Sequence, residues 1–83
     1  MKATVLIRPK EGILDPQGEA VGEALRTLGF GVTGARVGRL VDVELDAADD
    51  AEARVALDAM AHELLANPLI ESFTIELEEG AGE

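Results

Sequence analysis

The sequence predicts an α+β protein. In several segments apolar and polar residues alternate with a period of two, which is the pattern of strands that bury one face of a sheet. Two further segments place apolar residues at helical spacing and begin with residues that cap helices. The segments follow the order strand, helix, strand, strand, helix, strand. This βαββαβ order predicts a two-layer, ferredoxin-like sandwich, in which an antiparallel sheet carries both helices on one face.

The first two elements are a strand and a helix with strong boundary signals. Residues 3–8 alternate as a strand. Asp15 then offers a side-chain oxygen to the free N–H groups of a helix start, and Pro16 at the first helical position has no N–H to leave unpaired. Gly29 supplies the left-handed residue that commonly follows a helix. We therefore expect a helix from Asp15 to about Leu28.

Glycines mark two places where we expect close backbone approach or a change of direction. Gly18 and Gly22 lie four residues apart in the first helix, a spacing that lets another backbone approach one face. Further along, residues 32–37 and 40–45 both read as strands. Gly38 between them predicts a tight turn or bulge of a hairpin, and one long bent strand is the alternative.

The second half of the chain predicts one helix and one strand. Asp49 followed by Glu52 matches a capping box at a helix start. The helix should end at Asn67, because the residue before Pro68 avoids the helical region of backbone space. Residues 70–78 then alternate regularly, with the apolar set facing the core.

Length and composition restrict the class of protein. The 83 residues fit one domain, which we assign to residues 1–79, with residues 80–83 as a flexible acidic tail. The net charge of −10 disfavours binding to nucleic acid or to anionic membranes. The sequence has neither a run of apolar residues long enough to span a bilayer nor a signal-peptide core, which predicts a cytoplasmic protein. So small a core without cysteine favours a homo-oligomer.

Reactive side chains are few. No cysteine is present, and the single histidine, His62, has no second His or Cys with which to share a metal. Ser72 has no adjacent base, and the acidic residues around Asp49 are explained by helix capping. An acylphosphatase, which shares the predicted topology, needs a catalytic asparagine, but Asn67 is already explained by the proline that follows it. We therefore predict no catalytic, cofactor-binding or metal-binding residues in this chain.

Basic residues are the best candidates for partner contact. Arg36 and Arg39 flank the predicted turn at Gly38, and on so acidic a chain they could meet the carboxylates of a partner. The alternative is that they only maintain solubility and protect a sheet edge. With the loop at Asn67-Pro68, the candidate contact residues are Arg36, Gly38, Arg39, Asn67 and Pro68. Changing both arginines to glutamate should weaken assembly and leave the fold intact.

Three segments together resemble one family. They are Leu14-Asp15-Pro16-Gln17-Gly18, Val37-Gly38-Arg39 and Leu65-Ala66-Asn67-Pro68-Leu69-Ile70-Glu71. Their order and spacing resemble PurS, the small subunit of phosphoribosylformylglycinamidine synthase in purine biosynthesis. The resemblance covers nearly the whole chain, from the first strand through Glu78.

The resemblance implies a role in assembly. PurS proteins join a PurL-type synthetase subunit and a PurQ-type glutaminase subunit of an ATP-dependent ligase, and help ammonia from glutamine pass between them. The complex converts formylglycinamide ribonucleotide, glutamine and ATP into formylglycinamidine ribonucleotide, glutamate, ADP and phosphate. ATP and magnesium are then expected on the synthetase, with no cofactor in this chain. A homodimer or a tetramer is expected.

Two other functions fit the predicted fold. An ACT-like regulatory module shares the topology and binds small molecules at a glycine-containing turn after the first strand, which Lys10-Glu11-Gly12 could provide. A small enzyme of the ferredoxin-like class is the other. Ligand binding by the isolated chain would favour the first and turnover would favour the second.

Overall fold

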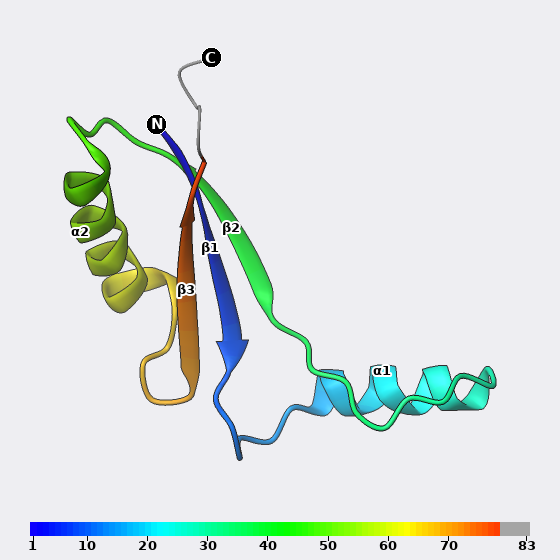
Figure 1. Cartoon of the computed structure of the whole chain (residues 1–83). Coiled ribbons are helices and arrows are strands. Elements are labelled where there is room, and N and C mark those ends of the chain that lie inside the picture. The colour runs from blue at the N-terminus through cyan, green and yellow to red at the C-terminus, as the bar shows by residue number, and fades with distance from the viewer. Residues whose placement is uncertain (79–83) are drawn as a thin grey trace.

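The computed structural model describes residues 1–78 (Figure 1). Residue 79 and the tail predicted at residues 80–83 lie outside the described residues. The elements are β1 (Lys2–Pro9), α1 (Pro16–Thr27), β2 (Arg39–Glu44), α2 (Asp50–Met60), the π-helical turn η1 (Ala61–Leu65) and β3 (Glu71–Leu77). The predicted α+β class, with an antiparallel sheet and two helices, is confirmed.

The sheet has the strand order β2-β1-β3, and both pairings are antiparallel. The first strand of the sequence is therefore the central one. Its register places Val5 opposite Val41 on one side and Ile75 on the other, so that apolar residues of all three strands share one face. On the opposite face Thr4 donates a hydrogen bond to the side chain of Asp42 (2.9 Å), its partner in the ladder.

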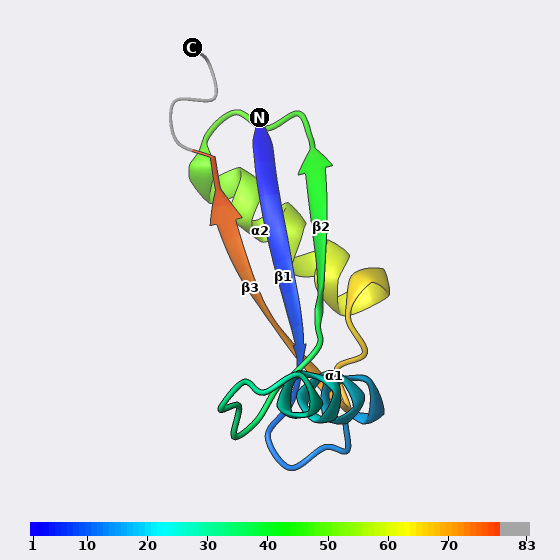
Figure 2. The same ribbon diagram turned by 90° about the vertical axis from the view of Figure 1, so that its right-hand side faces the viewer.

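The core lies between this sheet and α2, which crosses one face (Figure 2). Alternate residues of β1 and every fourth residue of α2 are buried, as their periods require. The fully buried set is Ala3, Val5, Ile7, Ala53, Leu57 and Ala61, with Ala66 nearly so. One helix covers three strands, so the apolar residues of the outer strands are only half-buried.

Helix α1 begins and ends as its sequence predicts. The Asp15 side chain accepts a hydrogen bond from the Gly18 N–H at 3.0 Å. At the other end Gly29 has a φ of +100°, and the Phe30 N–H donates to the Leu25 carbonyl at 3.1 Å, which is the six-residue bond of a Schellman motif.

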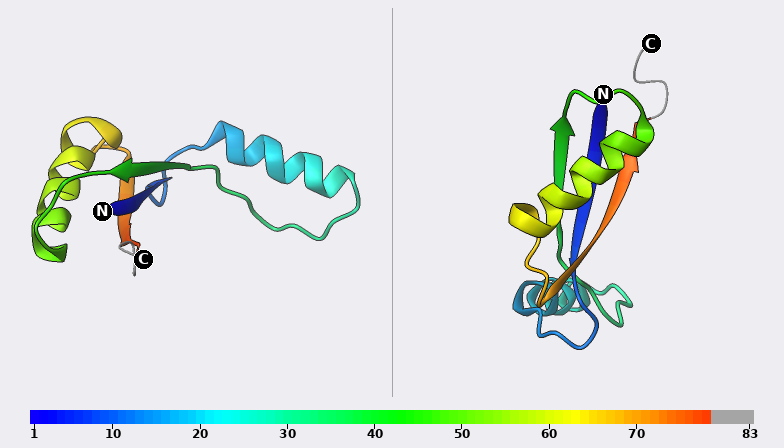
Figure 3. Two further views of the ribbon diagram at one scale, coloured as in Figure 1. Left: turned by 90° about the horizontal axis from the view of Figure 1, so that it is seen from above. Right: turned by 90° about the vertical axis from the view of Figure 1, so that its left-hand side faces the viewer.

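The position of α1 differs from the prediction. The helix does not cover the sheet but projects from one end of it, on the side away from α2 (Figures 1 and 3). The Cα radius of gyration is 16.0 Å, whereas a compact chain of this length has about 12 Å. We call residues 12–38, which comprise α1 and the chain that returns beside it, the arm. Of the two helices predicted to cover the sheet, α1 therefore does not pack on the sheet of its own chain.

The predicted hairpin is also wrong. Only β2 lies in the sheet, and residues 34–38, which we call the return segment, run as irregular chain beside α1. No turn forms at Gly38. Instead its backbone passes so close to β1 that a Cβ atom would meet the carbonyl oxygen of Ile7. A strand needs a neighbour with which to pair, and the described chain offers none to this segment.

Helix α2 begins with the predicted capping box. Asp49 accepts from the Glu52 N–H (2.8 Å), and the Glu52 carboxylate accepts from the Ala48 N–H (2.8 Å). Its last turn widens into η1, where the Ala66 N–H donates to the Ala61 carbonyl (2.9 Å). The chain then turns through Asn67 into β3.

Candidate partner-contact site

The three segments that define the family resemblance meet where the arm leaves the sheet. Residues 14–18 start α1, residues 37–39 lead into β2, and residues 65–71 lead into β3. Residues from all three segments line a hollow of about 230 Å³, together with Pro9 and Ile13. The five predicted contact residues also lie at or beside this place, which we call the arm base. Three segments that are distant in the sequence thus form one neighbourhood in the structure.

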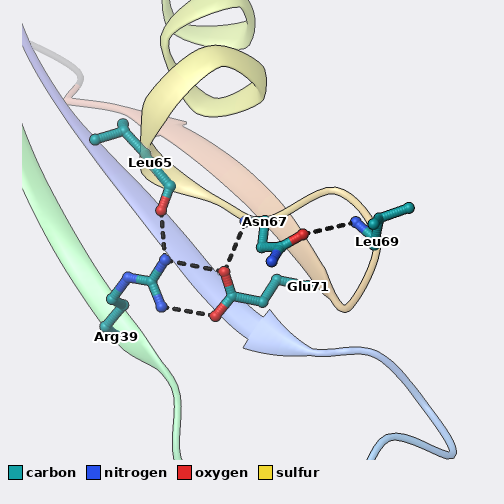
Figure 4. Close-up of polar contacts among 5 residues, drawn as sticks. All are labelled: Arg39, Leu65, Asn67, Leu69 and Glu71. Carbon is teal, nitrogen blue, oxygen red and sulfur yellow. Dashed lines mark hydrogen bonds and ion pairs between the residues drawn. The ribbon is translucent and has the colours of Figure 1, made fainter.

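Arg39 is bound within its own chain (Figure 4). It forms two hydrogen bonds with the Glu71 carboxylate, at 2.6 and 2.9 Å, and donates a third to the Leu65 carbonyl at 2.5 Å. The first pair is the bidentate geometry that a planar guanidinium makes with a carboxylate. The third caps the C-terminal end of η1, where unpaired carbonyls attract a cation. Arg39 therefore joins β2, β3 and the helix end.

The turn at Asn67-Pro68 is held by the same carboxylate. The Asn67 N–H donates to Glu71 at 2.8 Å, while its side chain accepts from the Leu69 N–H at 3.1 Å (Figure 4). The Pro68 carbonyl accepts from the ammonium group of Lys10 at 2.7 Å. Asn67 and Pro68 are exposed, but most of their polar groups bind neighbouring residues of this chain.

Arg36 ties the arm to the end of β1. Its guanidinium donates to the carbonyls of Pro9 and Lys10, at 2.5 and 2.8 Å, and lies 3.8 Å from the exposed carboxylate of Glu11. Like the Arg39 side chain, the Arg36 side chain is partly exposed to solvent and also forms hydrogen bonds within its own chain. A charge reversal at either arginine therefore changes the arm base as well as any partner contact.

Asp15 connects the two limbs of the arm. Its second carboxylate oxygen accepts from the Val37 N–H at 2.9 Å, in addition to the helix-capping bond to Gly18. A Cβ atom at Gly18 would lie 2.5 Å from the Ala35 carbonyl oxygen, so the return segment crosses α1 in direct backbone contact. The close approach predicted for Gly18 is confirmed.

Two carboxyl groups of the arm base have lowered pKa values. The hydrogen bond from Arg39, followed by that from the Asn67 N–H, lowers the pKa of Glu71. The N–H of Val37, followed by that of Gly18, lowers the pKa of Asp15. In each case the hydrogen bonds stabilise the ionised form, and in return Glu71 raises the pKa of Arg39.

These shifts predict that acid loosens the arm base. A carboxyl whose pKa is lower in the folded state stabilises the fold above its unfolded pKa, about 4. That stabilisation is lost as the pH falls through the lowered folded value. We expect the amide NMR signals of Gly18 and Val37 to move toward unbonded positions below about pH 4. The Val37 transition should be absent from an Asp15→Asn variant, and a Val37 transition retained in that variant would contradict its assignment to Asp15.

Some residues at the arm base were missing from the predicted contact set. Leu14 and Leu69 belong to the resembling segments, and their side chains are 74% and 82% exposed. Exposed large apolar side chains that lie close together are typical of interaction surfaces. Their signal in the sequence is an apolar residue placed directly before a helix cap or after a proline.

Other polar candidates lie away from the arm base. The His62 ring packs edge-on against Phe73, with centroids 5.3 Å apart, and its Nδ1 lies 3.0 Å from the Asp58 carbonyl oxygen. Within residues 1–78, no three His, Cys, Asp or Glu side chains gather where they could hold a metal ion. In the same part of the chain, neither helix is long and apolar enough to cross a membrane.

Fold and site together define a small α+β protein in which Arg36 ties a projecting arm to the end of a three-stranded sheet. A sequence model of PurS, described as phosphoribosylformylglycinamidine (FGAM) synthase, matches residues 2–79. The chain belongs to the PurS family, and it is thus a subunit of FGAM synthase in purine biosynthesis.

Curated relatives and solved structures agree with this assignment. The PurS subunit of Archaeoglobus fulgidus is 43% identical over 79 residues, covering 90% of this chain and 95% of the relative. The crystal structure of Methanocaldococcus jannaschii PurS is 33% identical with a TM-score of 0.83, covering 93% of this chain and 94% of that one. A chain in the structure of PurLQS from Thermotoga maritima is 28% identical with a TM-score of 0.84, covering 92% and 95%.

Proposed function

We propose that this chain is the non-catalytic assembly subunit of its FGAM synthase, joining a PurL-type synthetase subunit to a PurQ-type glutaminase subunit. The observation that carries the proposal is the convergence of the three family segments at the arm base, beside exposed apolar side chains. The exposed side chains of Leu14 and Leu69 form a surface, and the hydrogen bonds of Arg36 and Arg39 hold the segments beneath it in place. The similarity to a chain in the PurLQS structure supports such an assembly.

The proposed contribution to the reaction is the positioning of the other two subunits. Glutamine hydrolysis releases ammonia, which escapes or is protonated if it reaches bulk water. A subunit that holds the glutaminase against the synthetase converts this transfer into an event within one complex, at a high effective concentration. ATP and magnesium would then bind to the synthetase subunit, and the complex would work in the cytoplasm.

A homo-oligomer, either a dimer or a tetramer, is part of the proposal. The chain is elongated, with principal extents of 49, 31 and 14 Å, so it has a large surface for its size. On the sheet face away from α2, Leu6 and Leu40 are neighbours in the ladder, and Leu40 is exposed. Association with a second copy would add the buried area that a small domain lacks.

The test is glutamine-driven product formation by the synthetase and glutaminase subunits, with and without this chain. We expect the chain to raise that rate and to leave the ammonia-driven rate unchanged, because ammonia added to the solvent needs no transfer between subunits. If the three proteins are folded and at saturating concentrations, an unchanged glutamine-driven rate would contradict the assembly role.

The same assay of the three subunits tests whether the arm base is the contact surface. Leu69→Asp changes an exposed side chain at the arm base, and Leu64→Asp makes the same change at a residue of η1 that is 84% exposed. Since neither side chain supports the core, both variants should fold. We expect Leu69→Asp to weaken the complex, measured by the concentration of this chain needed for half of the maximal rate, and Leu64→Asp to have little effect.

The alternative of an ACT-like module stays a prediction. The turn proposed for its ligand has Gly12 in the left-handed region (φ +81°), while the ammonium group of Lys10 binds Pro68. Calorimetric titration of the isolated chain with amino acids tests this alternative directly.

A further inference from the structure

Three arginine residues line a second hollow near the arm base. The hollow has a volume of about 270 Å³ and lies where β1 and β2 meet the return segment, at the end of the sheet from which the arm projects (Figure 1). Arg8 belongs to β1, Arg36 to the return segment and Arg39 to β2. Leu6 and Leu40 line the same hollow, and Leu40 is 55% exposed. We call this place the arginine hollow.

Two of these arginines have N–H groups that remain free to bind a ligand. No ion pair within residues 1–78 involves Arg8, which is exposed near the end of β1. Arg36 is held by two backbone carbonyl groups through its Nη2 atom, while its Nη1 atom lies 3.8 Å from the Glu11 carboxylate, beyond hydrogen-bond distance. Arg39, by contrast, is bound to Glu71 and to the end of η1. Arg8 and Arg36 are therefore the donors that the hollow offers.

The distribution of charge directs an anion to this end of the sheet. The chain has a net charge of −10, yet four of its seven basic residues, Arg8, Lys10, Arg36 and Arg39, lie where the arm joins the sheet. At the other end of the sheet a larger hollow, of about 440 Å³, is lined by four carboxylates against one lysine. An anion is repelled there and attracted to the arginine hollow.

A phosphate group fits the free donors better than a single carboxylate does. A carboxylate has two oxygen atoms and is matched by one guanidinium, as Glu71 is by Arg39. A phosphate group has three or four acceptor oxygen atoms and up to two negative charges, so it can accept hydrogen bonds from two guanidinium groups at once. Two guanidinium groups on separate segments are what the arginine hollow provides.

We propose that the arginine hollow binds a phosphate group, either free or carried by a small molecule. Arg8 and Arg36 donate to its oxygen atoms, and the body of a phosphate ester lies against Leu40. The proposal goes beyond the assembly role and does not rest on it. Because Leu6 and Leu40 lie on the sheet face considered above for a second copy, the test uses the full chain in the oligomeric state that it adopts.

An NMR titration of the full chain with sodium phosphate tests the site, with sodium chloride at equal ionic strength as the control. We expect the amide signals of Arg8, Gly38 and Leu40, which line the hollow, to move and saturate with a dissociation constant of roughly 1 mM. Chloride should give no saturation. Phenyl phosphate should bind more tightly than inorganic phosphate if an ester is the ligand, because its ring covers Leu40, whereas equal affinities identify free phosphate. Acetate should bind roughly tenfold more weakly than phosphate.

Arg8→Gln is the decisive variant. Since Arg8 forms no ion pair within residues 1–78, the fold should not depend on it, and circular dichroism checks this. The dissociation constant for phosphate should rise roughly tenfold or more, because one set of charged hydrogen bonds is lost. Arg54→Gln removes the same charge on α2, away from the hollow, and should change the constant little. Arg8→Lys keeps the charge and should weaken binding less than Arg8→Gln does.

Several results would overturn the proposal. One is the absence of saturation with both phosphate and phenyl phosphate. Another is equal weakening in Arg8→Gln and Arg54→Gln, which would reduce the effect to net charge. Equal affinities for acetate and phosphate would exclude a phosphate site. The titrations involve neither the synthetase nor the glutaminase subunit, so a chain that fails to raise the glutamine-driven rate could still bind phosphate as expected.

Discussion

Replacing Gly38 by alanine should destabilise the protein by about 1–3 kcal/mol, the usual cost of inserting a methyl group into filled space. The added Cβ atom would meet the carbonyl oxygen of Ile7, which belongs to the central strand and cannot move without disturbing the sheet. The midpoint of urea unfolding, followed by circular dichroism, measures the loss.

Gly34 provides the matched control for this substitution. It lies in the same segment, has no positive φ, and a Cβ atom there would meet no other atom within 4 Å. Alanine at Gly34 should therefore be neutral or stabilise by about 0.4–1 kcal/mol, because it restricts the unfolded chain. Equal unfolding midpoints for the two variants would show that the backbone contact at Gly38 is unimportant.

Replacing Arg39 by glutamate should lower the melting temperature by several degrees and disorder the turn into β3. The change removes three hydrogen bonds and places a second carboxylate beside Glu71. The C-terminal end of η1 also loses its cation. Thermal unfolding gives the stability, and amide hydrogen exchange at residues 67–71 shows whether the turn opens.

Two further variants serve as controls for Arg39→Glu. Arg54→Glu makes the same charge change on the exposed side of α2, where no ion pair within residues 1–78 involves Arg54, and it should have a much smaller effect. Arg39→Lys keeps the charge but cannot form the bidentate pair, so its stability should fall between those of wild type and Arg39→Glu. If Arg39→Glu and Arg54→Glu have equal melting temperatures, general charge repulsion explains the loss of stability in both variants.

Local signals in the sequence predicted the boundaries of the elements. Asp15 and Asp49 cap the helices where they were expected to, because capping depends on residues three or four positions apart. The alternation predicted which residues are buried in β1 and which are half-buried in β3, since a strand has a fixed period of two. Gly29 likewise predicted the end of α1.

The arrangement of the arm could not be predicted from the same signals. An apolar stripe on α1 shows that one helix face seeks cover, but it does not say which surface provides it. Residues 32–37 have the pattern of a strand, but a strand forms only where a neighbour can pair with it. In the predicted sandwich, one chain supplies both the surface that covers α1 and the strand that pairs with residues 32–37. In the structure, α1 and the return segment project away from the sheet.

The five candidate contact residues lie close together in the structure, but the bonds that they form within their own chain could not be predicted, and their contact with a partner stays a prediction. Charge patterning drew attention to Arg36 and Arg39, but a long guanidinium side chain can reach many carboxylates and carbonyls. Glu71, which binds both Arg39 and Asn67, is distant from Arg39 in sequence. Such a contact follows from the crossing of three segments and has no local signature.

The central position of β1 affects how the chain folds as it is made. The ribosome releases this strand first, yet one of its two edges is filled only by β3, the last element of the sequence. Until then the nascent chain exposes an open edge of a strand that contains Val5, Leu6 and Ile7, and such an edge can template aggregation. Pairing across nearly the whole chain also slows folding, because a long loop must close before the contact forms. A chain that terminates early, before β3, should therefore be insoluble even though its first two strands are complete.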